Sequence, residues 1–389
     1  MTSQGAPQAC SAFVDRVRTT MAQVGPDFPY IADPETGEWT TTANGNWCGG
    51  HWIGLLWLAH EHTGDEAFAS VARAATDRMR AAMAADNMFY GMNHNYAGFR
   101  AYDHNGEDAH REIGLDGADR TVEYFHETAR QVPLGTLAIE APASNFRGPA
   151  DDDAGPSGAR LGAVDAIYTA LPVLWRAYRE TGDPSYRDVA VSHADRHLDW
   201  YVRDDGATWH HVEFDPETGD VIRQYNELAY SDDTCWARGQ GWCIAGLARA
   251  YRETDAGRYL DALEYVVEYY IEHTPDDLIP FWDFEHPDRP NVERDTSSAA
   301  LTAYGLTGLP AAGETEPLRA VGDRILDSLL TDYLTPVDES DTRQPGMVLE
   351  SCYNGPAGFA TKNEHVWTDY YTFYALSRRL AGELSQPGL

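Results

Sequence analysis

The chain has 389 residues, and its 62 acidic and 29 basic residues give a formal net charge of −33. Hydrophobic residues make up 43% of the sequence and aromatic residues 12%, enough to bury a large core, so a disordered acidic tail is excluded. A chain this acidic repels polyanions, and we therefore expect neither nucleic acid nor an anionic membrane surface as a partner.

The basic residues are unusual in kind, because Lys362 is the only lysine and all the others are arginines. An excess of acidic residues with almost no lysine favours a protein adapted to high salt, where screening reduces self-repulsion. A GC-rich genome that favours arginine codons is the alternative explanation.

The sequence shows no sign of a membrane span, a targeting segment or a metal site. The N-terminal residues contain no basic stretch followed by an apolar run, and no segment approaches the roughly 18 apolar residues of a spanning helix. The five cysteines form no CxxC pair, and neither metal-binding spacing nor a phosphate-binding loop is present. We expect a cytoplasmic protein without a metal ion or cofactor.

A pattern of two helices joined by a short polar turn recurs along the chain. In each unit the first helix is apolar on nearly all sides and the second is amphipathic, and the turn contains Gly or Asp, as in Thr63-Gly64-Asp65. The units are 52–86, 96–126, 166–198, 241–273 and 297–330, with a final half-unit at 370–384.

Helices without a polar face must be buried on all sides. Six such hairpins therefore predict an all-α fold in which an inner ring of helices lies within an outer ring, an (α/α)6 barrel. A linear solenoid of hairpins is the alternative. No break in composition divides the chain, so we expect a single domain over residues 1–389.

Long segments without helical periodicity favour the closed barrel, because its loops gather at one rim. They lie at 86–95, 140–164, 201–240, 276–296 and 335–369. Within the third of them, the alternating residues around a DPETG turn predict a small β-hairpin at about 205–225.

Aromatic and carboxylate side chains are concentrated in these loops, a combination that suits sugar binding. Asp165 stands just before an apolar helix, where it is either a catalytic group or an N-cap, and Asp295 before Thr-Ser-Ser fits an N-cap better. Arg238, flanked by tryptophans, is expected to be a buried guanidinium at the rim. Because neighbours in a strand point to opposite faces, we expect at most one of His210 and His211 to face the cavity.

Eight segments together resemble glycoside hydrolase family 88, the unsaturated glucuronyl hydrolases. They run in the family's order from about residue 47 to residue 376: WCGGHWIGLLWLAHEHTGD, NHNYAGF, VDAIYTALPVLW, CWARGQGWCIAGLARAYRET, FWDFEHP, RDTSSAALTAYGL, CYNGPAGFA and VWTDYYTFYAL. The resemblance implies an α/α barrel of six helical hairpins, in agreement with the repeat pattern.

The resemblance also implies a function. Enzymes of this family remove a 4,5-unsaturated uronic acid from the non-reducing end of the oligosaccharides left by polysaccharide lyases. They hydrate the C4=C5 bond without a metal or cofactor, and the resulting hemiketal opens and expels the neighbouring sugar. An aspartate protonates C4 and helps to deliver water to C5.

Matched motif by motif, Asp165 corresponds to the family's acid/base aspartate, and Arg238 is the candidate to bind the uronate carboxylate. His210 matches a hairpin histidine near the substrate. The other expected substrate-binding residues lie in the matched segments and are Trp47, His94, Gln240, Trp242 and Trp367.

One position departs from the family. The second aspartate of the family follows His in a His-Asp-x-Gly-Phe segment, whereas Asn95 follows His94 here. An amide binds sugar hydroxyls but cannot transfer a proton. Asn95 at this catalytic position is either natural, with an altered substrate or mechanism, or an engineered change.

Three other functions are open from the sequence. The related family 105, the unsaturated rhamnogalacturonyl hydrolases, performs the same chemistry on pectin fragments. A non-catalytic sugar-binding barrel would account for Asn95. A sugar epimerase would need a pair of positioned histidines, and the chain offers only the pair at 210–211.

We predict that the protein is more stable in molar salt than in dilute buffer. With a net charge of −33, repulsion within the folded chain is largest when it is unscreened. The melting temperature should therefore rise from low to molar potassium chloride. A flat or falling melting temperature would instead favour the codon-usage explanation.

Overall fold

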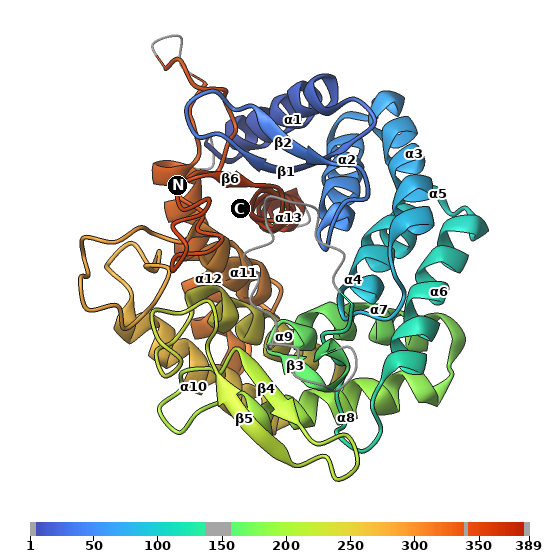
Figure 1. Cartoon of the computed structure of the whole chain (residues 1–389). Coiled ribbons are helices and arrows are strands. Elements are labelled where there is room, and N and C mark those ends of the chain that lie inside the picture. Colours follow the sequence, from blue (N-terminus) through green and yellow to red (C-terminus); the bar gives the residue numbers. More distant parts are fainter. Residues whose placement is uncertain (1–4, 137–156, 338–340, 385–389) are drawn as a thin grey trace.

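The computed structural model describes residues 5–136, 157–337 and 341–384 of the chain (Figure 1). Helices dominate it, and their apolar faces form one large core cluster. Within the described ranges, no helix has both the length and the apolar character needed to cross a membrane.

Six helical segments form a closed inner ring. They are α2 (Gly49–Thr63), α4 (Phe89–His94) with its continuation through the π-helical turn η1 (Asn95–Phe99) and α5 (Arg100–Asn105), α7 (Ala166–Thr181), α9 (Ala237–Thr254), α11 (Thr296–Thr307) and α13 (Val366–Leu384). Each contacts the next, and α13 contacts α2. This closure distinguishes the barrel from a linear solenoid, and the predicted fold is confirmed.

The second helix of each unit packs outside this ring. The outer helices are α1 (Gly5–Val24), α3 (Glu66–Ala82), α6 (Asp108–Tyr124), α8 (Pro184–Trp200), α10 (Gly257–His273) and α12 (Glu316–Ser328). A π-helical turn, η4 (Leu329–Tyr333), follows α12, and the short 3-10 turns are η2 (Ser157–Arg160) and η3 (Gly313–Thr315). The predicted half-unit at 370–384 is completed by α1, which packs on α13 although it comes from the other end of the chain.

The hairpin turns follow from the repeated Thr-Gly-Asp sequence. Gly64 takes a left-handed φ of 69° and ends α2, and the side chain of Asp65 accepts a hydrogen bond from the Ala67 amide at the start of α3. Gly182 and Asp183 do the same between α7 and α8. A glycine that tolerates positive φ, followed by an N-capping aspartate, therefore reverses the chain within two residues.

Close packing of the inner helices depends on small residues. All residues of α11 are buried. A Cβ atom on Gly54 would lie 2.3 Å from the ring of Tyr370, so only glycine lets α2 approach α13 at the point of closure. The inner ring is thus filled by side chains and is not a channel.

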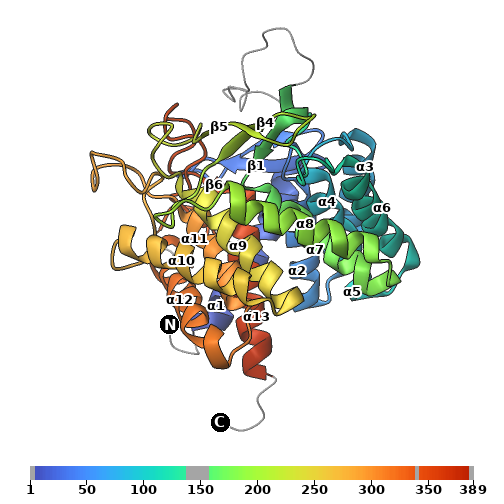
Figure 2. The same ribbon diagram turned by 90° about the horizontal axis from the view of Figure 1, so that it is seen from below.

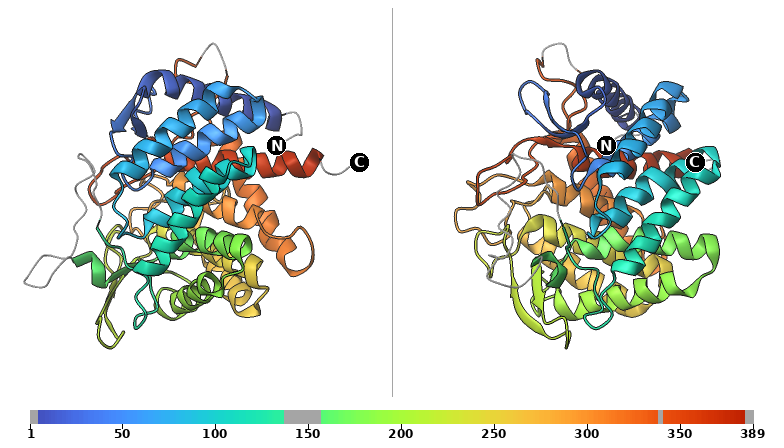
Figure 3. Two further views of the ribbon diagram at one scale, coloured as in Figure 1. Left: turned by 90° about the vertical axis from the view of Figure 1, so that its right-hand side faces the viewer. Right: turned by 45° about the vertical axis from the view of Figure 1, so that its right-hand side comes forward.

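Two small antiparallel sheets lie at one end of the barrel (Figures 2 and 3). One has the order β2-β1-β6, from Trp39–Thr42, Phe28–Ala32 and Glu364–His365; the other has the order β3-β4-β5, from Leu161–Ala163, His211–Phe214 and Val221–Tyr225. The hairpin predicted at 205–225 is β4–β5. The first sheet was not predicted.

Two of the predicted loops need comment. Segment 86–95 is not a loop throughout, because α4 begins at Phe89. Much of segment 140–164 lies outside the described residues, and its described end contains η2 and β3.

Candidate active site

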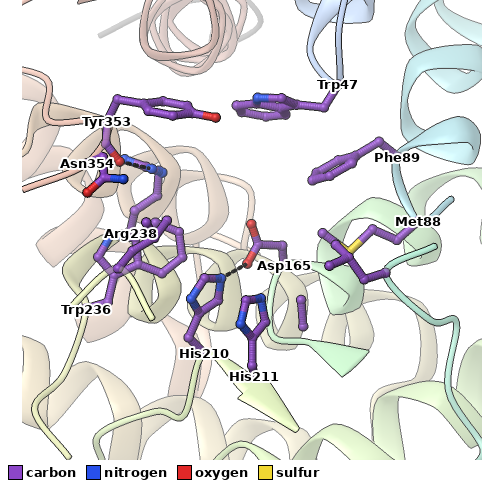
Figure 4. A pocket seen from close by; sticks show the side chains of 13 residues that line it. Trp47, Met88, Phe89, Asp165, His210, His211, Trp236, Arg238, Tyr353 and Asn354 are labelled. Atoms are coloured by element: carbon purple, nitrogen blue, oxygen red, sulfur yellow. Dashed lines mark hydrogen bonds and ion pairs between the residues drawn. The ribbon is translucent and has the colours of Figure 1, made fainter. Parts of the chain in front are cut away.

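A pocket opens at the end of the barrel that carries the two sheets (Figure 4). Its lining comes from the N-terminal ends of the inner helices α2, α4, α7 and α9 and from the loops beside them. The lining residues are Trp47, Met88, Phe89, Leu134, Ala163, Asp165, His210, His211, Leu228, Trp236, Arg238, Tyr353 and Asn354.

Asp165 is the only residue with a carboxyl group among the described residues of this lining. It immediately precedes α7 with helical φ and ψ, and its side chain makes no capping hydrogen bond, which excludes the N-cap interpretation. One oxygen, Oδ1, lies 3.9 Å from Nε2 of His210 and has no hydrogen-bond partner within the described part of the chain. Burial raises the pKa of Asp165 to about 7, although the charge of Arg238 opposes this shift.

His210 and His211 both line the pocket, so the expectation that at most one would do so is wrong. His210 comes one residue before β4 begins, and the alternation of a strand does not apply to it. Their rings stack with centroids 3.7 Å apart (Figure 4). Burial lowers the pKa of both rings, that of His211 to about 3, so both are neutral near pH 7.

Arg238 lies in the first turn of α9 and is buried. Its Nη2 donates to the Tyr353 carbonyl at 2.8 Å, and its Nη1 donates to the Cys352 carbonyl and lies 3.5 Å from the Asp295 carboxylate. The guanidinium also stacks over the Trp236 ring at 4.5 Å. These contacts hold the cation at the pocket with few degrees of freedom, while a planar guanidinium with five N–H donors keeps some of them for a ligand.

Asp295 is the N-cap of α11, as predicted. Its Oδ1 accepts a hydrogen bond from the Ser297 amide at 3.0 Å. Its other oxygen faces Arg238, so one buried aspartate both starts an inner helix and partly neutralises the cation of the pocket.

Trp47 forms an aromatic wall of the pocket, opposite Asp165 and the histidines (Figure 4). Its ring packs against Phe89, with centroids 5.1 Å apart, and its indole nitrogen donates to the Tyr30 hydroxyl at 3.3 Å. Asn93 fixes its backbone, because the Asn93 amide donates to the Trp47 carbonyl at 2.9 Å. The wall is therefore rigid.

Four predicted substrate-binding residues do not line this pocket. Gln240 is fully buried and donates to the carbonyls of Gly206 and Val266, so its amide joins loops to α10. Nδ1 of His94 donates to the Tyr90 carbonyl at 2.9 Å, and the ring stacks on the Tyr90 ring. Trp242 and Trp367 are also fully buried, and Trp367 lies behind Trp47 with centroids 4.7 Å apart. Of the four, Trp367 supports the pocket directly, because it packs against the lining residue Trp47.

Asn95, predicted to be catalytic, is not among the residues that line this pocket. Asn95 begins η1 and lines a second cavity, together with Arg100 on α5. The family segment has five residues from His to Phe, whereas His94–Phe99 has six, and a π-helical turn accommodates such an extra residue. The extra residue rotates the preceding side chains about the helix axis relative to those that follow.

Several lining residues were missed from the sequence. Tyr353 and Asn354 belong to the segment CYNGPAGFA, which carries the family resemblance, so that segment offered a signal. Met88 and Phe89 fell in a segment predicted to be a loop, and no local pattern distinguishes them. Within the described ranges, no group of three or more His, Cys, Asp or Glu side chains is placed to hold a metal ion.

Comparison with known proteins decides the family. The model of Glycosyl Hydrolase Family 88 matches residues 15–280, which is more than half of the chain. The chain belongs to glycosyl hydrolase family 88.

Other members of family 88 resemble the chain along nearly its whole length. An unsaturated glucuronyl hydrolase of Bacillus sp. (strain GL1) is 29% identical over 370 residues, 92% of each chain. An unsaturated chondroitin disaccharide hydrolase of Streptococcus pneumoniae (strain ATCC BAA-255 / R6) is 28% identical over 97% of this chain and 92% of its own. The crystal structure of the Bacillus sp. GL1 enzyme superposes with a TM-score of 0.84 at 25% identity, covering 97% of both chains.

This family 88 chain is therefore a glycoside hydrolase of the unsaturated glucuronyl hydrolase type. The family match favours this assignment over family 105, over a non-catalytic barrel and over an epimerase. The main support for a non-catalytic barrel was Asn95, which lies outside the pocket.

We predict that Asp165→Asn stabilises the protein above neutral pH. The pKa of Asp165 in the folded chain, about 7, lies above the ordinary value of 3.8 for an aspartate. The stability linked to its protonation is therefore present at low pH and is lost as pH rises to about 7. The neutral amide avoids this loss. The gain in melting temperature of the variant over the original chain should therefore be larger at pH 8 than at pH 4.

Asp183→Asn is the matched control, because Asp183 also directly precedes a helix, caps it and has a lowered pKa. Its effect should not grow in the stabilising direction as pH rises. A gain for Asp165→Asn that is equal at both pH values contradicts the raised pKa.

Proposed function

We propose that this chain removes a 4,5-unsaturated uronic acid from the non-reducing end of lyase-generated oligosaccharides, with Asp165 as the catalytic acid and base. The observation that carries the assignment of Asp165 is the single carboxyl group in the described lining of the pocket, with a pKa of about 7. Ordinary glycosidases use two carboxyl groups that flank the glycosidic bond. One group that is protonated about half the time near neutral pH fits a hydration reaction better.

The reaction proceeds by addition of water to an enol ether. Protonated Asp165 gives its proton to C4, and the C4=C5 electron pair forms the new C–H bond, leaving a cation shared by C5 and the ring oxygen. Water adds to C5 and returns a proton to the Asp165 carboxylate. The resulting hemiketal opens at the bond between C5 and the ring oxygen, and C1 then releases the neighbouring sugar.

Arg238 is proposed to bind the carboxylate of the uronic acid. It is the cation of the described lining, since both histidines are neutral. The N-terminal ends of α2, α4, α7 and α9 also point to this rim, and their positive dipole ends favour an anionic ligand. Trp47, Trp236 and Tyr353 supply flat apolar faces for the sugar ring.

His210 is proposed to position the substrate and the attacking water. Its Nε2 lies 3.9 Å from Oδ1 of Asp165, too far for a direct hydrogen bond, so both groups are available to bind a ligand. Because burial holds the ring neutral, His210 orients groups by hydrogen bonding without raising the acidity of Asp165.

The substrate class rests on the relatives. Those in Bacillus and Streptococcus pneumoniae are an unsaturated glucuronyl hydrolase and an unsaturated chondroitin disaccharide hydrolase. We propose an unsaturated glucuronyl disaccharide for this chain, and a panel of lyase products identifies the preferred linkage and sulfation.

All five cysteines are buried and free, which supports a reducing, cytoplasmic location.

We predict that Asp165→Asn lowers turnover by about a hundredfold to ten-thousandfold, the usual effect of losing a general acid. The substrate's ultraviolet absorbance disappears on hydration, so its decay measures the rate. The variant should remain folded, with an unchanged circular dichroism spectrum. Retained turnover would remove Asp165 from the reaction.

The pH profile provides an independent check of the same role. Because the reaction starts from protonated Asp165, turnover of the original chain should fall as pH rises above about 7. Activity that stays constant to pH 9 is incompatible with Asp165 as the proton donor.

We predict that Arg238→Lys raises the Michaelis constant about tenfold or more. A lysine keeps the charge but loses the planar fork that reaches both the carbonyls and a carboxylate. Arg294→Lys is the matched control, because Arg294 donates to the Ile279 carbonyl and pairs with Asp277 without lining the pocket. Equal Michaelis constants for Arg238→Lys and the original chain would exclude Arg238 as a substrate ligand.

A further inference from the structure

A second cavity, of about 220 Å³, lies at the opposite end of the barrel. Its lining comes from α7, α9 and α13, beyond the first turn of each, and from η1, α5 and α11. We call it the arginine cavity, because six arginines line it: Arg100, Arg176, Arg179, Arg249, Arg252 and Arg378. Asn95 and four tyrosines, Tyr96, Tyr304, Tyr370 and Tyr374, also line it.

The charge of this cavity is opposite to that of the chain. The protein has a net charge of −33 and only 29 basic residues, yet six of them meet here. Asp103 is the only acidic residue among the described residues that line the cavity. A random distribution of charges over the surface would produce an acidic cavity.

Four of the arginines have carboxylate partners. Arg100 pairs with Glu61 at 2.8 Å, and Arg176 with Asp103 at 2.6 Å. The other two are Arg249, which pairs with Glu253 at 2.8 Å, and Arg179, which pairs with the same glutamate.

Arg252 and Arg378 have no such partner. In the described ranges no carboxylate lies within ion-pair distance of either of them. They are also close together, because a Cβ atom built on Gly308 would lie 3.0 Å from Nη1 of Arg252 and 2.8 Å from Nη1 of Arg378. Two neighbouring guanidinium groups repel each other unless an anion lies between or beside them.

Helix capping accounts for only part of this arrangement. Arg378 donates to the Tyr304 carbonyl at 2.6 Å and stacks over the Tyr304 and Tyr374 rings. Arginines at the C-terminal ends of helices complement the helix dipole. Arg252, however, is exposed and makes no hydrogen bond with any described residue, so its guanidinium stays available to a ligand of the cavity.

The titration of two groups supports a positive potential in the cavity. Arg252 is exposed, but desolvation by the surrounding side chains and the charges of Arg249 and Arg378 lower its pKa to about 10. Burial alone would raise the pKa of Tyr374, but Arg100, Arg378 and Arg249 bring it below its usual value. Both shifts indicate cations in excess of the nearby carboxylates.

We propose that the arginine cavity binds a multivalent tetrahedral oxyanion, sulfate or phosphate, with Arg252 and Arg378 as its principal ligands. Guanidinium groups match the oxygen spacing of such anions through paired N–H donors. The amide of Asn95 offers a neutral donor in the same cavity. The anion is either a free inorganic ion or a sulfate ester carried by a sugar.

Isothermal titration calorimetry on the full chain tests the proposal. Sodium sulfate and sodium phosphate are titrated in potassium chloride at constant ionic strength, so that screening does not change. We expect one binding event per chain, and in Arg252→Gln an affinity at least about tenfold weaker. Arg187→Gln on the outer helix α8, where an exposed arginine pairs with Asp188, should bind as the original chain does.

Thermal unfolding provides a second measurement that separates binding from general salt effects. Sulfate and phosphate stabilise many proteins by exclusion from their surface, and that effect acts equally on all three proteins. Binding adds a further rise in melting temperature that Arg252→Gln loses and Arg187→Gln keeps. An equal rise in all three, or no heat of binding in the original chain, overturns the proposal.

A third arm identifies the source of the anion. A sulfated disaccharide and its unsulfated form are titrated into the original chain and into Arg252→Gln. If a sulfate ester is the ligand, the affinity of the sulfated disaccharide falls in the variant and that of the unsulfated disaccharide does not. If a free ion is the ligand, Arg252→Gln weakens the binding of the inorganic ions and leaves the affinity of both disaccharides unchanged. Because Arg252 is at the other end of the barrel from Asp165, hydrolysis should be unchanged in Arg252→Gln, so these results stand apart from the proposed reaction.

Discussion

The parallel direction of the six inner helices governs the whole molecule. Because each inner helix is buried, its return must be made by an outer helix, and every inner helix then begins at the same rim. Positive dipole ends meet at the pocket and negative ends at the other rim. The pocket therefore suits an anionic sugar, and the opposite rim gathers arginines. The arginines at that rim outnumber the carboxylates that pair with them, because Arg252 and Arg378 have no carboxylate partner among the described residues.

The features of the fold that arise within one segment could be predicted from the sequence, and the contacts between distant segments could not. The Thr-Gly-Asp turns and the apolar first helices identify hairpins, because each signal lies within one continuous segment. The partner of α13 is α1, at the far end of the chain, and no local repeat connects the two. The sheet β2-β1-β6 likewise pairs Ile31 with His365, and strands this short carry no sequence pattern that predicts their partner.

The same distinction applies to the site. Asp165, His210, Arg238 and Trp47 lie at positions fixed by the start of a helix or a strand, and the motif match places them in one pocket. Asn95 lines another cavity, because it begins a π-helical turn, and the extra residue in that turn changes the direction of the side chains. Gln240 occurs in the most recognisable segment, yet its amide is used by two backbone carbonyls. A residue in a family motif is expected to lie near the site. Whether its side chain faces the site depends on whether its polar groups are already hydrogen-bonded elsewhere.

The acidity of Asp165 depends first on its burial and then on the charge of Arg238. Burial alone would raise its pKa, and Arg238 lowers it. Arg238 in turn lies 3.5 Å from Asp295, which is fully buried at the start of α11 and takes up part of the guanidinium's attraction. A fully available cation would favour the ionised form of Asp165 and weaken it as a proton donor. The Asp295 carboxylate thus has two roles: it caps the inner helix α11, and it offsets part of the Arg238 charge beside Asp165.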